Sequence, residues 1–367
     1  MILAVIAAIA AAYQVFAMLA CVLRGGKGAS GQGPGAWGQR SAAKGQQPVS
    51  VLKPIRGLDP GLREAIRSHT VLLGEYELLC GVSDPGDPAR AVLKEFFRVR
   101  LVECTTAAPN GKVGVLMDLA RAARYPVLVV NDADIRVEPD YLARVTAPLA
   151  DPGVGLVTCL YRPVGSTFAA RFEGLGVATD FAPSALVARL VGVDEFAMGS
   201  TLAFRTADLE RIGGFAALAD YLADDYQLGH RIHALGLKCV LSDVIVETHL
   251  GGSWRQVWAH QVRWARTIRV SRFAGYLGLP VTNATLWAVV MAAFGRWDLA
   301  AMLLAARLAM AYTAGWRVMR SRDALRLWLL VPARDLFGFA VWVAGLFGNT
   351  VQWRDRRLRL GRDGRIL

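Results

Sequence analysis

Apolar residues gather at the two ends of this chain, and that distribution constrains its fold more than any other feature. Residues 1–23 read MILAVIAAIAAAYQVFAMLACVL and contain no charged side chain. A helix of about 20 apolar residues is long enough to cross a bilayer. We therefore expect an uncleaved transmembrane anchor at 1–23. A cleaved signal peptide is the competing interpretation, but the run is long and has no basic residues before it.

Residues 276–350 contain three further apolar stretches and are expected to form C-terminal membrane helices. Charged residues interrupt them, including Arg307, Arg334 and Asp335. Ionisable groups at membrane depth tend to pair or to face other helices. Arg334 and Asp335 are candidates for such a pair, and one stretch is a candidate for an interfacial helix. The number of membrane crossings stays open.

The net charge of +12 is concentrated in two segments. Residues 24–47 are basic and rich in Gly, Ser and Gln, as a flexible linker would be, and residues 351–367 form an arginine-rich tail. Basic flanks mark the cytoplasmic side of a membrane, so we expect both segments and the domain between them to face the cytoplasm. No aromatic platform accompanies the basic runs, so a nucleic-acid partner is not expected. The 5 cysteines show no CxxC spacing and fit buried free thiols in a reducing compartment.

Between the apolar ends, residues 48–275 alternate short apolar runs with amphipathic stretches. We expect strands at 49–55, 76–84, 99–105, 127–134 and 154–161, and helices from about 60 to 72, 89 to 99 and 113 to 125. This alternation is typical of an α/β domain with a mostly parallel sheet. Ligands of such sheets bind beyond the carboxyl ends of the strands.

Three pairs of aspartates occupy positions where such a sheet binds ligands. They are Asp84 and Asp87, Asp132 and Asp134, and Asp224 and Asp225. A DxD pair at a strand end suits Mg²⁺ or Mn²⁺, which prefer oxygen ligands and bind proteins through one or two carboxylates plus phosphate oxygens. Each pair also has a plainer interpretation: a solvated turn for the first two, and a helix N-cap for Asp225.

A later segment, VWAHQVRWARTIRVSR, places His260 and Trp264 on one face of a helix with Arg263 beside them. Arginine can neutralise a diphosphate, and tryptophan can stack on a sugar. The alternative is a basic helix at the membrane surface with interfacial tryptophans, which is common.

The order of these features resembles that of the lipid-linked GT-A glycosyltransferases. The stretches SDPGDPA, VLVVNDADIRVEPDYL, MGSTLAFR, LADDYQLGHRIHALG and HQVRWARTIR are most similar to the ceramide glucosyltransferase family and its bacterial relatives, including hopanoid-biosynthesis glycosyltransferases. The resemblance runs from about Val49 to the end of the chain. It implies a GT-A fold, Rossmann-like with a mostly parallel sheet, in a bacterial inner-membrane protein whose catalytic domain faces the cytoplasm.

The same resemblance implies a role for each site residue. Asp225 corresponds to the catalytic base, and Asp134 completes a metal-binding DxD that holds Mg²⁺ or Mn²⁺. The expected substrate-binding residues are Asp84, Asp87, Lys112, Asp132, His260, Arg263 and Trp264.

The implied reaction is inverting transfer of glucose or N-acetylglucosamine from a UDP-sugar to a hydroxyl of a membrane lipid, either ceramide or a hopanoid. Residues 168–200 are apolar with scattered charge, and could line the lipid's path or form an ordinary core helix. A processive polysaccharide synthase is disfavoured by His260, where cellulose- and hyaluronan-type synthases have glutamine, and by the small number of membrane helices. A catalytically inactive nucleotide-sugar-binding module and a small transporter are further alternatives.

Overall fold

The computed structural model describes residues 2–29, 47–353 and 356–367. Its contacts divide the chain into two compact units. The sheet unit comprises Ser30–Tyr161 and Val193–His249, and the helical unit comprises Met1–Ala29, Arg162–Gly192 and Leu250–Leu367.

One mixed sheet organises the sheet unit. Within the described residues it has 8 strands in the order β3-β2-β1-β4-β7-β6-β8-β5. The pairs β1–β2, β2–β3 and β1–β4 are parallel, whereas β4–β7, β6–β7 and β5–β8 are antiparallel. The strands are β1 (Val49–Pro54), β2 (Tyr76–Val82), β3 (Val99–Glu103), β4 (Val127–Val130), β5 (Ile135–Arg136), β6 (Val154–Gly165), β7 (Leu202–Arg205) and β8 (Lys238–Leu250).

Helices cover both faces of this sheet, and the residues of β4 show why. Val127 and Val129 belong to one buried core, and Leu128 and Val130 belong to the other. Alternate side chains of a strand point to opposite faces, so a central strand buried on both faces is apolar throughout. The helices of this unit are α3 (Leu62–Thr70), α4 (Ala89–Lys94), α5 (Gly111–Ala122), α6 (Tyr141–Thr146), α9 (Thr206–Arg211) and α10 (Asp224–Ala234), with 3₁₀ turns at Ala147–Ala150 and Phe215–Leu218.

The strands and helices predicted for residues 48–161 are present with shifted ends. The helix expected from 89 to 99 stops at Lys94, and the strand expected from 127 to 134 stops at Val130. Beyond Val130 the chain leaves the centre of the sheet, and β5 pairs with β8 at its edge. The sequence NDAD therefore lies in a turn at the carboxyl end of β4.

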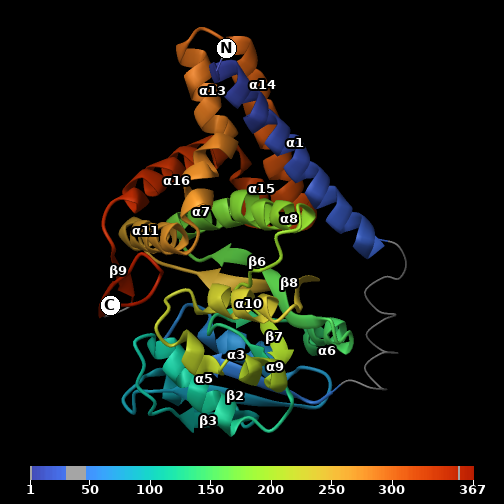
Figure 1. Cartoon of the computed structure of the whole chain (residues 1–367), viewed down its shortest axis with the longest axis vertical. Coiled ribbons are helices and arrows are strands. Elements are labelled where there is room, and N and C mark those ends of the chain that lie inside the picture. The colour runs from blue at the N-terminus through green and yellow to red at the C-terminus, as the bar shows by residue number, and fades with distance from the viewer. Residues whose placement is uncertain (1, 30–46, 354–355) are drawn as a thin grey trace. The chain divides into compact units, whose positions relative to one another are not determined.

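The helical unit is built from three separate segments of the chain (Figure 1). Its first two segments are α1 (Ile2–Ala29) and the run α7 (Phe168–Gly176), η2 (Val177–Phe181, a π-helix) and α8 (Ala182–Leu190). The third holds α11 (Trp254–Ser271), α12 (Phe273–Gly278), η4 (Leu279–Thr282), α13 (Ala284–Ala293), α14 (Trp297–Tyr312), η5 (Thr313–Val318), α15 (Arg322–Arg326), η6 (Trp328–Leu330), α16 (Val331–Leu346), β9 (Thr350–Trp353) and β10 (Arg356–Arg359).

Among the described residues, 3 helical stretches are long and apolar enough to cross a membrane: Leu3–Arg24, Trp297–Val318 and Trp328–Leu346. A further pair, Phe273–Thr282 and Ala284–Ala293, meets the same test but bends by 53° between its parts. The bend begins at Asn283, whose side chain caps α13 by accepting a hydrogen bond from the Leu286 N–H.

Several predicted boundaries differ from those of the structure. Helix α1 continues to Ala29, six residues into the predicted linker, and the rest of that linker up to residue 46 lies outside the described residues. Residues 162–192 and 250–275 belong to the helical unit, although we expected one domain from 48 to 275. The predicted tail contains the antiparallel pair β9–β10, and Arg269 of α11 donates a 2.7 Å hydrogen bond to the Gly348 carbonyl just before β9.

The predicted pair of Arg334 with Asp335 is wrong. Asp335 accepts two hydrogen bonds from Arg307 of α14, at 2.8 and 2.7 Å, and a third from Thr285 of α13 at 2.5 Å. Adjacent residues of a helix point in directions about 100° apart, so Arg334 faces a different neighbour from Asp335. Its guanidinium donates to Gln261 of α11 at 2.8 Å.

Candidate active site

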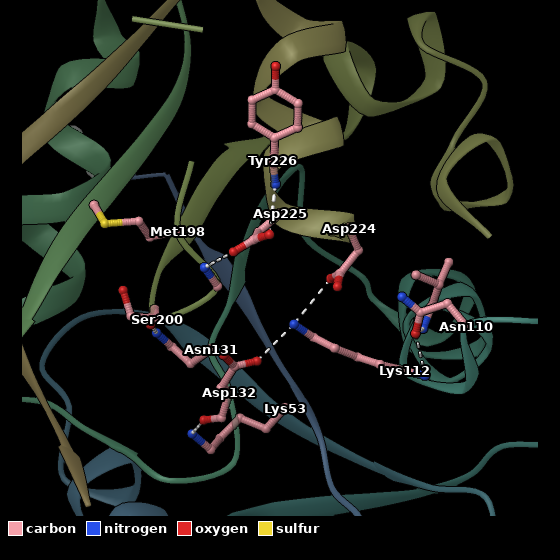
Figure 2. Close-up of polar contacts among 12 residues, drawn as sticks. Lys53, Asn110, Lys112, Asn131, Asp132, Met198, Ser200, Asp224, Asp225 and Tyr226 are labelled. Atoms are coloured by element: carbon pink, nitrogen blue, oxygen red, sulfur yellow. Dashed lines mark hydrogen bonds and ion pairs between the residues drawn. The ribbon is translucent and has the colours of Figure 1, made fainter. Parts of the chain in front are cut away.

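Lys112 links two of the predicted aspartate pairs within the sheet unit. Its ammonium lies 2.8 Å from Asp132 Oδ1 and 3.1 Å from Asp224 Oδ2, between the end of β4 and the start of α10 (Figure 2). Burial opposes the ammonium charge, but the carboxylates of Asp132, Asp224 and Asp225 outweigh burial and raise the Lys112 pKa above its ordinary value. The lysine is therefore charged, and it neutralises only part of the carboxylate charge around it.

The start of helix α5 determines where Lys112 lies. Asn110 is the N-cap: its side-chain oxygen accepts the backbone N–H of Lys112 at 3.0 Å and that of Val113 at 3.4 Å. The Asn110 amide also donates to the Tyr221 carbonyl at 2.8 Å, which connects α5 to the segment leading into α10. One asparagine thus fixes both the lysine and the loop that carries its second acidic partner.

Asp225 is held by backbone groups on both carboxylate oxygens. Oδ2 accepts the Gly199 N–H at 2.9 Å, and Oδ1 accepts the Tyr226 N–H at 2.8 Å (Figure 2). Burial and the adjacent Asp224 carboxylate raise the Asp225 pKa to about 6. A fixed, half-buried carboxylate whose pKa approaches neutrality has the properties required of a general base.

Gly199 brings the backbone against this cluster. A Cβ atom added there would lie 2.8 Å from Asp132 Oδ2 and 3.4 Å from the Lys112 ammonium. The first distance is too short for a real Cβ contact, so only glycine leaves the Asp132 carboxylate where it is. The same residue donates its N–H to Asp225, and therefore contacts both halves of the cluster.

Asp134 is the second carboxylate of the NDAD turn, and Thr248 of β8 donates a hydrogen bond to its Oδ2. Burial and the neighbouring Asp132 carboxylate raise the Asp134 pKa to about 6. The described residues hold no cluster of three His, Cys, Asp or Glu side chains arranged for a metal. Mg²⁺ and Mn²⁺ commonly use one or two carboxylates together with substrate phosphates. Asp134 beside Asp132 fits a cation that binds jointly with a diphosphate.

Buried polar groups beneath the turn hold its backbone in place. The Asn131 amide donates to the Ser200 carbonyl at 2.7 Å and to the Tyr141 hydroxyl at 2.8 Å. The Lys53 ammonium donates to the Asp132 carbonyl at 2.9 Å, and burial lowers the Lys53 pKa to about 8. A lysine at the end of β1 thus supports the main chain of the turn and leaves the Asp132 carboxylate available to Lys112.

The first aspartate pair occupies the loop after β2, and its two members differ. Asp87 is buried, and its two oxygens accept the backbone N–H groups of Gly57 and Ala89, each at 2.8 Å. Asp84 is exposed, and its Oδ1 accepts the Gly86 N–H at 2.8 Å. Asp87 shapes the loop, whereas Asp84 keeps an accessible carboxylate.

His260 and Trp264 lie on α11 in the helical unit, with ring centroids 4.7 Å apart, so the predicted shared face is present. His260 Nδ1 is 2.6 Å from Glu173 Oε1 of α7, and Gln261 donates to the same oxygen at 2.8 Å. The Trp264 ring lies 6.3 Å from that of Phe181. Arg263 occupies the same helix between the two motif residues.

Sequence reasoning assigned no role to Gly199, Thr248 or Glu173. Gly199 stands in the resemblance motif MGSTLAFR, but a glycine gives no chemical signal until its neighbours are known. Glu173 had a usable signal, because it is an acid inside an apolar stretch and needs a polar partner when buried. Thr248 had none, since threonine is ordinary in a strand.

The fold and the carboxylate cluster define a class of protein. A mannosyltransferase from Pyrobaculum calidifontis, solved with GDP-mannose and Mn²⁺, superposes with a TM-score of 0.51 at 22% identity, covering 93% of this chain and 99% of that one. At that identity the likeness establishes the fold, which is the predicted GT-A fold. The chain therefore has the GT-A fold, and its sequence family makes it a glycosyltransferase.

The family follows from sequence. The profile of glycosyl transferase family 21 matches residues 2–366, and the chain belongs to that family. Ceramide glucosyltransferase 1 of Caenorhabditis elegans is 29% identical over 204 residues, which are 53% of this chain and 44% of that protein. Ceramide glucosyltransferase 3 of the same organism is 25% identical over 342 residues, 87% of this chain and 74% of that protein. The alignment with ceramide glucosyltransferase 1 thus spans less than half of that protein's length. The predicted resemblance to the ceramide glucosyltransferase family is confirmed.

Proposed function

We propose that this protein transfers a hexose from a UDP-sugar to a hydroxyl of a ceramide-type membrane lipid, with inversion at the sugar and with Asp225 as general base. The observation that carries the proposal is the Asp225 carboxylate, held by two backbone N–H groups next to a partly neutralised acidic cluster. The names of two family relatives support the acceptor class.

Asp225 would remove the proton from the acceptor hydroxyl as its oxygen attacks the anomeric carbon of the donor. The bond from that carbon to the diphosphate oxygen breaks, and UDP departs with the electron pair. A base is most effective when its pKa lies near the working pH, and the raised pKa of Asp225 meets that condition. Its two backbone donors fix the direction of the carboxylate, so little reorganisation is needed during proton transfer.

Lys112 would bind the diphosphate of the donor, with Asp132 and Asp84 contacting the nucleoside and Asp87 shaping the loop beneath it. Asp134 with Asp132 would hold a divalent cation, which when bound stabilises the negative charge that develops on the departing UDP. For α11, we propose that Arg263 neutralises diphosphate charge and that His260 and Trp264 bind substrate. Without the cation the carboxylates repel one another and the anionic diphosphate, so we expect donor and cation to bind cooperatively.

Several finer assignments remain part of the proposal. UDP-glucose is the first donor to test, because the named relatives are glucosyltransferases, and UDP-N-acetylglucosamine is the second. A hopanoid is the alternative acceptor. We further propose a location in a bacterial inner membrane with the sheet unit facing the cytoplasm, which would give the enzyme access to cytoplasmic nucleotide sugars.

The test is lipid mass spectrometry on purified protein in nanodiscs. Wild type, Asp225→Asn and Asp220→Asn would each receive ceramide or bacteriohopanetetrol, with isotopically labelled UDP-glucose or UDP-N-acetylglucosamine. Asp220 is a matched control, because it is exposed and precedes the same helix. We expect labelled glycosylceramide from wild type and from Asp220→Asn. Loss of a general base lowers turnover about 10²- to 10⁴-fold, so Asp225→Asn should form almost none.

Each result decides one part of the proposal. If only bacteriohopanetetrol becomes labelled, the acceptor is a hopanoid and not a ceramide, and the proposed mechanism still holds. Wild-type turnover by Asp225→Asn would refute the general-base assignment. Folded wild type that labels neither lipid with either donor would refute the proposed substrates.

A further inference from the structure

Asp180 is an exposed carboxylate in the π-helix η2, which joins α7 to α8 in the helical unit. It forms no hydrogen bond or ion pair with any residue in the described part of the chain. Arg307, Asp335 and Arg334 lie close enough to act on it electrostatically, as does Tyr13 of α1. Single-turn π-helices occur frequently at functional sites.

The charged side chains that act on Asp180, namely Arg307, Asp335 and Arg334, each have a hydrogen-bond partner, which makes Asp180 unusual. Arg307 and Asp335 form a buried bidentate pair through Nε and Nη2, and the third guanidinium nitrogen, Nη1, donates to the Thr179 carbonyl at 2.9 Å. Polar groups next to membrane helices are costly when unpaired, so partners are the rule. A carboxylate left open beside this satisfied network is available to bind a ligand.

Arg334 supplies a second unsatisfied group close to the first. Its guanidinium is buried and donates to Gln261 at 2.8 Å, but its Nε–H has no partner among the described residues. The same guanidinium packs on Gly176, where an added Cβ would lie 2.4 Å from it. Gly176 precedes Asp180 by one helical turn, and residues four apart share a helix face. An unpartnered donor of α16 and an open carboxylate of η2 therefore lie near each other.

The hydrogen-bonding groups of Asp180 and Arg334 limit the kind of ligand that can bind both. A group that binds both must accept a hydrogen bond from Arg334 and donate one to Asp180, as amides and hydroxyls do. A phosphate or carboxylate headgroup would meet the negative charge of Asp180 and be disfavoured. The ligand is therefore a neutral molecule that carries at least one amide or hydroxyl group.

The position of η2 indicates where such a ligand comes from. Phe181, the last residue of η2, has its ring 6.3 Å from the Trp264 ring of the α11 motif. On its other side, Arg307 of the candidate span Trp297–Val318 binds the Thr179 carbonyl. A ligand at Asp180 would thus lie between the motif expected to bind substrate and the helices expected to contact lipid.

We propose that Asp180 and Arg334 bind the polar headgroup of the acceptor lipid, a neutral lipid with amide and hydroxyl groups such as ceramide. This inference rests on the proposed function and adds specificity-determining residues to it. The competing explanation is that Asp180 only balances the charge of Arg334. In that case, replacing Asp180 would lower the stability of the protein without weakening lipid binding.

The test measures lipid binding separately from transfer. A photoactivatable ceramide would be crosslinked to full-length wild type, Asp180→Asn, Asp180→Glu and Asp298→Asn in nanodiscs, with excess unlabelled ceramide as competitor. Hydrolysis of UDP-glucose without acceptor and the melting temperature would be recorded for the same samples. Asp298 is the matched control, because it pairs with Arg296 at the exposed turn between α13 and α14.

Loss of a hydrogen bond to a charged group weakens binding about ten- to a hundredfold. We expect that decrease in competed labelling for Asp180→Asn, with partial recovery in Asp180→Glu and wild-type labelling in Asp298→Asn. Donor hydrolysis and melting temperature should be unchanged in all of them. Wild-type labelling by Asp180→Asn, or a lower melting temperature with unchanged labelling, would overturn the inference. Absence of competed labelling in wild type would also overturn it. Labelled wild type that transfers no sugar would refute the proposed function but leave the lipid site.

Discussion

Replacing Gly199 with alanine should impair catalysis while leaving the protein folded. The added Cβ would lie 2.8 Å from Asp132 Oδ2, several tenths of an ångström inside a normal contact. The Asp132 side chain is 40% exposed and can move away, so the backbone need not shift. Its movement would lengthen the 2.8 Å contact with Lys112 and displace both groups from the donor.

The expected change in stability and the expected change in reaction rate differ in size. Weakening one partly exposed ion pair costs about 1 kcal/mol of unfolding free energy or less. Misplacing a substrate-positioning group by up to 1 Å can cost about a hundredfold in rate. We therefore expect kcat/KM for Gly199→Ala to fall about ten- to a hundredfold, with a change in stability too small to explain it.

Gly111→Ala is the matched control for this experiment. Gly111 precedes Lys112 directly, and a Cβ added there meets nothing within 4 Å. Alanine at the first position of α5 should leave activity intact and favour the helix slightly. Both variants would be assayed for sugar transfer and for thermal unfolding. A kcat/KM for Gly199→Ala within twofold of wild type would refute the reasoning, because the cluster would then tolerate the displacement.

Four other predictions concern charge. Activity should fall as the pH drops through about 6, because the raised pKa of Asp225 leaves the base protonated there; a pH–rate profile flat from 5 to 8 would contradict this. The same shift means that the folded state binds the proton more tightly than the unfolded state, so Asp225 should reduce the unfolding free energy as the pH rises from its ordinary pKa towards 6. Chelation by EDTA should abolish transfer and added Mn²⁺ or Mg²⁺ should restore it, whereas full activity in EDTA would argue against the cation at Asp134. Arg307→Met should destabilise the protein by about 3–5 kcal/mol by leaving Asp335 buried and unpaired, and Arg307→Met with Asp335→Leu should recover part of that loss in thermal unfolding.

The positions of the strand-end carboxylates could be predicted from the sequence, because the order of strands and helices restricts them to one edge of the sheet. A strand as apolar as β4 must be buried on both faces, and the polar residues that follow it must then lie at the sheet's carboxyl edge. Lys112 was named only through the family resemblance, although it lies in the first turn of the helix that precedes this strand. The contact of Lys112 with both Asp132 and Asp224 was not predictable, because it depends on how closely α10 approaches α5.

The helical unit was harder to anticipate from the sequence. Residues 168–200 show no period that separates a membrane-facing helix from a core helix, and the structure assigns 168–192 to the helical unit. The partner of Asp335 was mistaken because adjacency in sequence suggested Arg334. A residue on another helix, Arg307, satisfies the carboxylate instead. Pairings between helices depend on rotation and register, which hydropathy does not reveal.

The division of the chain has a consequence for synthesis on the ribosome. The sheet unit ends at His249, so its core can form while the rest of the chain is still being made. Helix α8 packs on α1, which is made before it, whereas α7 packs on α11, α15 and α16, which are all made after β7 and β8. Helix α7 must therefore wait, exposed to chaperones or lying on the membrane, until the C-terminal helices are made. A chain that stalls after His249 would contain all residues of the sheet unit, but its segment Arg162–Gly192 would lack the C-terminal part of the helical unit. We expect quality-control proteases to recognise such a chain by the apolar surface that this segment exposes.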